Sequence, residues 1–244
     1  MIPKIIHYCW FGNKTLPKSA QKCIASWKRY FPDYEICEWN EANFDVNTIP
    51  FTQEAYERKK YAFVSDYARF WILYHYGGLY FDTDVQVIRP MDDVLARGAF
   101  MGIEKSHISL GVNPGLGLAT VPNTMVYETI LNYYAHLHFV DTNGKQIPGT
   151  IVKHTTDVLT DLGFVCEDRM QQISDVWIYP NDWFNPLDDA TGRLAITNNT
   201  CSIHLYAKTW VDNYGPLRKW IMRRLHRILG VDRLQWFKNI LRYN

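Results

Sequence analysis

Residues 65–84 read SDYARFWILYHYGGLYFDTD, and this stretch decides the expected fold. Residues 54–76 predict one long helix, which ends at Gly77-Gly78 because glycine readily adopts the backbone that closes a helix. Residues 79–88 (LYFDTDVQVI) then predict a buried strand, or two strand pieces around a turn, that ends before Pro90. The stretch therefore predicts an apolar helix followed by a strand that carries two aspartates.

Segments with the periodicity of strands and of helices alternate in the N-terminal part of the chain. The expected strands are residues 4–11, 34–39, 100–104, 176–179 and 202–206, and the expected helices are residues 17–30 and 124–138. Residues 108–120 are rich in glycine and predict a flexible loop. Because strands that alternate with helices usually pair in parallel, the pattern predicts an α/β fold.

Asp82 and Asp84 are the residues that carry the expected chemistry. In an extended chain, side chains two residues apart point the same way, so both carboxylates would face one point, where their repulsion requires a cation. Mg²⁺ or Mn²⁺ accepts such oxygen ligands and fills its other positions with water and substrate phosphates. A short motif of this kind is often only a pair of surface aspartates. Its place after a buried strand favours a ligand site, because ligands of open α/β sheets bind beyond the carboxyl ends of strands.

The helix before this motif contributes two more charged residues. Asp66 and Arg69 are three residues apart and share one helical face. An ordinary surface ion pair is the alternative, worth at most about 1 kcal/mol. The surrounding sequence is apolar, however, and charges in such a helix require partners. A ligand that bears hydroxyl and phosphate groups would supply them.

Two parts of the sequence resemble the DXD-containing sugar transferases of glycosyltransferase family 32. These parts are residues 61–90, which include the DTD motif, and residues 2–12 (IPKIIHYCWFG). Relatives of that family include yeast α-mannosyltransferases and large glucosylating toxins. Residues 178–186 (IYPNDWFNP) and 203–210 (IHLYAKTW) are more weakly similar. The resemblance implies a GT-A (Rossmann-like) nucleotide-sugar-binding fold with a mixed central sheet. It also implies a UDP- or GDP-sugar donor, Mn²⁺ or Mg²⁺, and retention of the anomeric configuration.

The resemblance further implies roles for individual residues. Asp82, Asp84 and His204 would bind the metal, although a lone histidine after a strand is often a core residue. Asp82, Asp84 and Arg69 would act on the departing diphosphate. The residues expected to contact the donor are Trp10, which would stack on the base, and Ser65, Asp66, Arg69, Tyr80, Asp82, Lys208 and Trp210. Asn113 is the expected acceptor-side contact, with a plain turn asparagine as the alternative.

The C-terminal residues are the most basic part of the chain. Residues 217–244 contain eight Lys/Arg and one acid, whereas the remaining 216 residues contain 18 basic and 24 acidic side chains. Apolar side chains between Leu217 and Leu229 recur on one face of a helix, and arginines occupy the other face. We therefore divide the chain into a glycosyltransferase domain, 1–216, and a basic amphipathic helical tail, 217–244. We expect the tail to lie on an anionic membrane surface, with packing on the domain as the alternative.

Composition limits the location and the partners. The net charge of +1 gives no global attraction to nucleic acid, so no nucleic-acid partner is expected. Five widely spaced cysteines without a CxxC pair indicate reduced thiols rather than a disulfide framework or a zinc site. No stretch approaches membrane-spanning length, and no signal peptide is evident. We expect a cytoplasmic protein that is peripheral on the inner face of the plasma membrane.

The predicted function is transfer of a hexose from a nucleotide sugar, with UDP favoured, to a saccharide acceptor that can be lipid-linked. Bacterial members of the resembling family often build capsule, exopolysaccharide or lipopolysaccharide, and this compact chain is similar to them. Two other functions remain open. One is a phosphohydrolase of the haloacid dehalogenase kind with Asp82 as nucleophile. The other is a non-catalytic module that binds sugar nucleotides.

Overall fold

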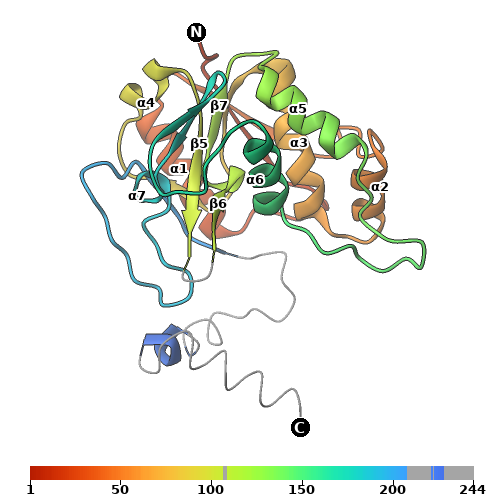
Figure 1. Cartoon of the computed structure of the whole chain (residues 1–244). Helices are drawn as coiled ribbons and strands as arrows, with labels where there is room; N and C mark the ends of the chain where they lie inside the picture. Colours follow the sequence, from red (N-terminus) through yellow and green to blue (C-terminus); the bar gives the residue numbers. More distant parts are fainter. Residues whose placement is uncertain (107–108, 208–220, 222, 228–244) are drawn as a thin grey trace.

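The computed structural model describes residues 1–106, 109–207, 221 and 223–227 (Figure 1). A mixed sheet forms the centre, and helices cover both of its faces. One buried cluster joins the sheet to α2, α3, α5 and α6, and a second joins its other face to α1, α4 and α7. No helix among the described residues is long and apolar enough to span a membrane.

The elements follow one another in the order that their numbers give. The strands are β1 (Ile5–Cys9), β2 (Glu35–Trp39), β3 (Gly78–Tyr80), β4 (Val85–Val87), β5 (Ala99–Lys105), β6 (Leu110–Val112), β7 (Leu118–Thr120), β8 (Gln171–Ile173), β9 (Val176–Tyr179) and β10 (Ser202–His204). The helices are α1 (Lys18–Tyr30), α2 (Pro50–Glu57), α3 (Tyr61–Tyr76), α4 (Asp92–Arg97), α5 (Met125–Ala135), α6 (Ile151–Asp161) and α7 (Asn181–Phe184), with a 3-10 turn, η1 (Pro114–Leu116).

The central sheet has the strand order β2-β1-β3-β7-β5-β9-β8, and β6 pairs with β5. β1 runs parallel to β2 and β3, whereas β7 is antiparallel to both β3 and β5. β4 leaves this sheet and pairs with β10 in a separate antiparallel ribbon. The predicted α/β fold with a mixed central sheet is therefore confirmed. Because β1 and β3 are parallel, the residues that follow them lie at the same sheet edge.

The single helix expected over residues 54–76 is wrong, since the chain forms two helices there. α2 ends at Glu57, and α3 begins at Tyr61. Lys59 between them has φ +58°, a left-handed conformation that no α-helix contains. Its N–H and that of Lys60 bond back to the carbonyls of Tyr56 and Ala55, at 2.8 and 2.9 Å, and close α2. Three consecutive cations, residues 58–60, occupy this break.

The flexible loop expected over residues 108–120 is also wrong for the described residues 109–120. This segment forms β6, η1 and β7, and nearly all of it is buried. Its glycines serve close packing: a Cβ on Gly111 would lie 2.7 Å from the Thr156 hydroxyl, and one on Gly117 2.9 Å from the Phe81 ring. Helix α6, which carries Thr156, was not predicted.

His7 on β1 ties the first two strands to the end of α3. Its Nε2–H donates to the carbonyl of Gly77 at 3.0 Å, and its Nδ1 accepts from the Trp39 indole at 3.0 Å. Both ring nitrogens are therefore occupied in the neutral form, and a second proton would displace Trp39. Burial lowers the pKa of His7 to about 4, although the bond to Gly77 opposes this shift.

We predict that His7 makes the protein less stable in acid. A histidine whose folded pKa lies below its unfolded value stabilises the fold above the unfolded pKa of about 6.5, and that stability is lost as the pH falls toward 4. The loss amounts to about 3 kcal/mol. Urea unfolding between pH 7 and pH 4 measures it. In His7→Gln, which keeps a donor but does not titrate, the pH dependence should shrink; an unchanged dependence would contradict the assignment.

Candidate active site

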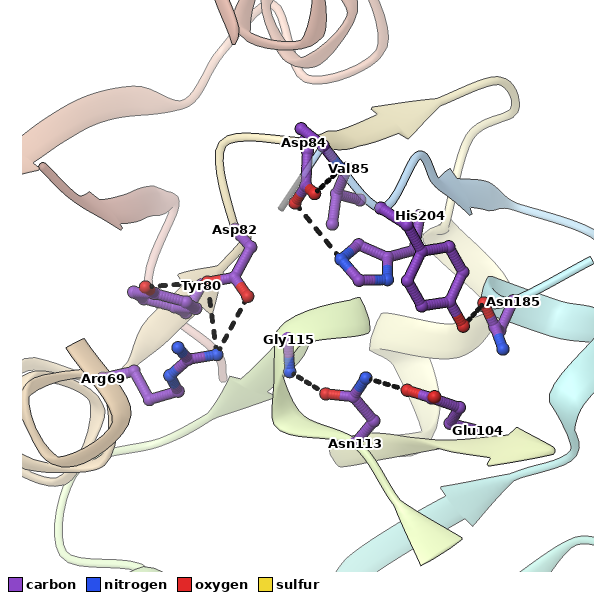
Figure 2. A network of polar contacts seen from close by, with 12 residues as sticks. Arg69, Tyr80, Asp82, Asp84, Val85, Glu104, Asn113, Gly115, Asn185 and His204 are labelled. Carbon is purple, nitrogen blue, oxygen red and sulfur yellow. Dashed lines mark hydrogen bonds and ion pairs between the residues drawn. The ribbon is translucent and has the colours of Figure 1, made fainter. Parts of the chain in front are cut away.

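Asp82 and Asp84 lie in a turn between β3 and β4 rather than in one extended strand. The N–H of Val85 donates to the carbonyl of Asp82 at 2.9 Å and closes the turn. The expectation that an extended backbone aligns the two side chains is thus wrong, and the turn brings them together instead. β10 adds His204, which stands opposite Val85 in the β4–β10 ribbon. Ligand atoms of Asp82, Asp84 and His204 all lie within 4.8 Å of one another (Figure 2).

The last residue of β10 and the segment that follows it hold Asp84. His204 Nε2 lies 3.2 Å from Asp84 Oδ1, and the N–H of Ala207 donates to Asp84 Oδ2 at 2.8 Å. Between them, Tyr206 has φ +51°, and its hydroxyl donates to Asn185 Oδ1 at 2.8 Å. This left-handed residue turns the chain so that the next N–H meets the carboxylate.

The charges of Asp84 and His204 stabilise each other. Burial by itself would raise the pKa of Asp84, but His204 and the N–H of Ala207 lower it to about 2. Burial would likewise lower the pKa of His204, and Asp84 raises it to about 9. The other ring nitrogen, Nδ1, is buried and has no hydrogen-bond partner within the described part of the chain. Two carboxylates and an imidazole at this spacing fit a divalent cation.

Arg69 on α3 connects Asp82 to Asp66. Its side chain is 3% exposed; Nη1 lies 3.2 Å from Asp82, and Nη2 donates to Asp66 Oδ1 at 3.1 Å. The guanidinium also stacks over the ring of Tyr80, whose hydroxyl donates to Asp82 Oδ1 at 3.1 Å. Asp66 and Arg69 share one helical face, as the spacing predicts, and they pair with each other. The ion pair that we gave as the alternative is therefore present, but it is buried rather than on the surface.

Burial dominates the titration of these acids. It raises the pKa of Asp66 to about 7, although Arg69 opposes the shift. It also raises the pKa of Asp82, again against Arg69. The pKa of Arg69 itself is raised, because the charges of Asp82 and Asp66 outweigh the effect of its burial. The guanidinium of Arg69 therefore remains charged, and the carboxylates of Asp66 and Asp82 share its hydrogen-bond donors.

Four expected donor contacts have other partners in the structure or lie outside its described residues. The hydroxyl of Ser65 donates to the carbonyl of Tyr61 at 3.2 Å, while its own carbonyl accepts from Arg69 Nε at 3.0 Å. Trp10 follows β1 at the sheet edge that carries the Asp82 turn, and its indole N–H donates to the carbonyl of Lys14 at 2.5 Å. Lys208 and Trp210 lie outside the described residues.

Asn113 lies in the η1 turn, where its amide is held on both sides. Its Oδ1 accepts from the N–H of Gly115 at 2.7 Å, and its Nδ2 donates to Glu104 at the end of β5 (Figure 2). Sequence reasoning missed Glu104, and also Tyr206 with its partner Asn185. The only available signal for Glu104 was a carboxylate at the end of the apolar strand AFMGIE.

Known glycosyltransferases are similar to this chain in sequence and in fold. Residues 17–101 match the family model described as "Glycosyltransferase sugar-binding region containing DXD motif". The architecture is that of a mixed α/β protein consistent with a GT-A fold. It is similar to the crystal structure of a glycosyltransferase involved in the glycosylation of the major capsid of PBCV-1, with a TM-score of 0.51 and 12% identity over 91% of this chain and 100% of that one. Residues 17–101 are thus similar to the DXD-containing sugar-binding region of glycosyltransferases.

Curated relatives include two mannosyltransferases of Schizosaccharomyces pombe. Inositol phosphoceramide mannosyltransferase 1 is 30% identical over 57% of this chain and 45% of its own length. Inositol phosphoceramide mannosyltransferase 2 is 30% identical over 94% of this chain and 64% of its own length. The match therefore spans about half to two thirds of these relatives.

We predict that Arg69→Met destabilises the protein by about 3 kcal/mol, because removal of one partner leaves buried charges uncompensated. Urea unfolding at pH 7 measures the loss. Arg58→Met is the matched control, since Arg58 pairs with Glu57 at 3.9 Å on the surface and its loss should cost under about 1 kcal/mol. Adding Asp66→Asn to Arg69→Met should recover part of the stability. Equal effects of the two single variants would contradict the buried network.

Proposed function

We propose that the chain is a metal-dependent retaining glycosyltransferase that transfers a hexose from a nucleotide sugar to a saccharide acceptor. The observation that carries this proposal is the cluster of Asp82, Asp84 and His204 beside the buried Arg69. A divalent cation held by that cluster would supply positive charge to a diphosphate. Mn²⁺ and Mg²⁺ both suit these ligands, and a UDP-sugar is the favoured donor.

The chain's own residues supply the remaining positive charge and the orientation. Arg69 presents a permanent cation next to Asp82, where it can pair with the sugar or the diphosphate. Asp66 accepts hydrogen bonds and can hold donor hydroxyls, since only one of its oxygens meets Arg69. In a retaining front-face reaction, the departing phosphate oxygen takes the proton of the acceptor hydroxyl, so the protein needs no separate base. Catalysis then rests on positioning and charge stabilisation.

The phosphohydrolase alternative finds less support. A nucleophilic Asp82 would need one oxygen directed at phosphorus. Here Tyr80 donates to Oδ1, and Arg69 contacts both oxygens. The match of residues 17–101 to a sugar-binding family also favours transfer of a sugar.

The acceptor and its location belong to the same proposal. The names of the two yeast relatives specify a lipid, inositol phosphoceramide, which supports a lipid-linked saccharide acceptor for this chain. We place the protein in family 32, in synthesis of a surface polysaccharide (capsule, exopolysaccharide or lipopolysaccharide), peripheral on the cytoplasmic face of the plasma membrane. The tail would provide the membrane contact.

The described part of the tail packs on the domain and still exposes apolar side chains. Arg223 pairs with Asp189 at 3.2 Å, and Arg227 donates to the carbonyl of Thr191 at 2.6 Å. Ile221 and Leu225, one helical turn apart, are 42% and 36% exposed. Packing on the domain and binding to a membrane are thus compatible. The arginines of the tail can contact the loop around Asp189 and Thr191 while its apolar side chains contact lipid.

We predict that, in the presence of Mn²⁺ or Mg²⁺, the protein hydrolyses at least one sugar nucleotide of a test panel. The panel consists of UDP-Glc, UDP-Gal, UDP-GlcNAc, UDP-GalNAc and GDP-Man. EDTA should abolish release of the nucleotide diphosphate, and Asp84→Asn should lower it by at least about 100-fold. Asp157→Asn is the matched control, because Asp157 forms an exposed pair with Lys153 and should leave activity unchanged. Full turnover in EDTA, or p-nitrophenyl phosphate hydrolysis without sugar turnover, would refute the proposal.

We predict that the full chain sediments with anionic liposomes and that residues 1–216 alone do not. Serine at both Ile221 and Leu225 should weaken sedimentation. Val165→Ser is the control, since Val165 is a similarly exposed apolar residue (45%) outside the tail. Equal sedimentation of the full and shortened chains would remove the membrane from the proposal.

A further inference from the structure

The η1 turn lies directly against the carboxylate of Asp82. A Cβ built on Gly115 would lie 2.5 Å from Asp82 Oδ2 and 3.0 Å from Asn113 Oδ1. Figure 2 shows this glycine on the side of Asp82 that faces Asn113, below the Asp84–His204 pair. The backbone of residue 115 therefore occupies the space into which the Asp82 carboxylate could otherwise swing.

The backbone conformation of residue 115 does not require glycine, because its φ lies outside the left-handed region. The neighbouring Gly117, with φ +138°, does adopt such a conformation. Space is what requires glycine at 115, and the atom that defines this space is an oxygen of a predicted metal ligand.

Glu104 and Asn113 hold the turn in place. Asn113 Nδ2 donates to Glu104 Oε2, and Asn113 Oδ1 accepts from the N–H of Gly115 at 2.7 Å. The main chain adds a bond from Asn113 N–H to the carbonyl of Gly102 at 2.9 Å. The side-chain contacts run from β5 through Asn113 to the backbone that touches Asp82.

The opposite side of Asp82 is fixed as well. Arg69 contacts its carboxylate at 3.2 Å, and the Tyr80 hydroxyl donates to Oδ1 at 3.1 Å. The carboxylate is therefore enclosed between two donors, the charged Arg69 on α3 and the neutral hydroxyl of Tyr80 on β3, and the backbone of η1. Such enclosure restricts both position and rotation, on which the affinity of a cation for a carboxylate depends.

We propose that Glu104, Asn113 and Gly115 are positioning residues that set the orientation of the Asp82 carboxylate. The contacts of Glu104 with Asn113, and of Asn113 with Gly115, hold residue 115 next to Asp82 Oδ2. Arg69 and Tyr80 contact the same carboxylate from the other side. This inference rests on the proposed function for its consequence, cation binding, but its structural claim concerns Asp82 alone.

The variant Gly115→Ala tests the claim directly. The added methyl meets the end of a short side chain rather than backbone, so Asp82 should move while the fold stays intact. A crystal structure of the variant should show Asp82 Oδ2 displaced from its contact with Arg69. Mn²⁺ affinity, followed by the electron paramagnetic resonance of free Mn²⁺, should fall about tenfold or more. The melting temperature should change by less than about 4 °C.

Two variants at Glu104 test whether this residue affects Asp82 through Asn113 and Gly115. Glu104→Ala removes the acceptor for Asn113 and should weaken Mn²⁺ binding by about threefold to tenfold. Glu104→Gln keeps an acceptor oxygen and should bind Mn²⁺ as the wild type does. A merely structural role of Glu104 would lower the melting temperature of both variants without separating their affinities.

The outcomes separate this inference from the proposed function. If Gly115→Ala leaves Asp82 in place, or leaves Mn²⁺ affinity unchanged in a protein that binds Mn²⁺, the positioning role is wrong. If the wild type binds neither Mn²⁺ nor a sugar nucleotide, the proposed function fails, and the position of Asp82 in the crystal structures still decides the role of Gly115.

Discussion

Arg69 carries a permanent charge into the interior, and the site is built around the need to neutralise it. A guanidinium that is 3% exposed has lost most of its hydration, so its donors must meet acceptors inside the protein. Asp66 supplies one carboxylate from the same helix, and Asp82 supplies the other from the turn after β3. This requirement fixes α3 relative to the end of β3 and places Asp82 where a ligand can reach it.

The two acids of the motif occupy different electrostatic environments. Asp82 shares Arg69 with Asp66, and burial raises its pKa. Asp84 has its own partners in His204 and the N–H of Ala207, and its pKa falls to about 2. Asp84 is therefore the more firmly ionised of the two. Three carboxylates face two basic side chains. When all three carboxylates are ionised, an excess of negative charge remains even with His204 protonated, and this excess favours a bound cation.

How much of this the sequence could predict depends on the range of the interactions. The Asp66–Arg69 contact is local and follows from helical spacing, and the acids after a buried strand follow from the strand pattern. The β4–β10 ribbon, by contrast, joins residues far apart in the chain, and only its register places His204 beside Asp84. The resemblance to a known family indicated His204. The only signal for Glu104, which contacts Asn113, was its place at the end of an apolar strand. The turn at Asp82 was one of two open possibilities, because LYFDTDVQVI fits a continuous strand equally well.

The glycines of residues 111–117 show why the sequence wrongly predicted a flexible loop in this segment. Glycine allows both conformational freedom and close approach, and composition does not distinguish between them. At Gly111 and Gly117 the neighbours are a helix side chain and a core ring, so the glycines serve packing. At Gly115 the neighbour is the carboxylate of Asp82, so the same property bears on the site. Whether a glycine serves a flexible loop or close packing depends on the atom that would contact a Cβ at that position. For these three glycines, that atom belongs to a residue distant in sequence.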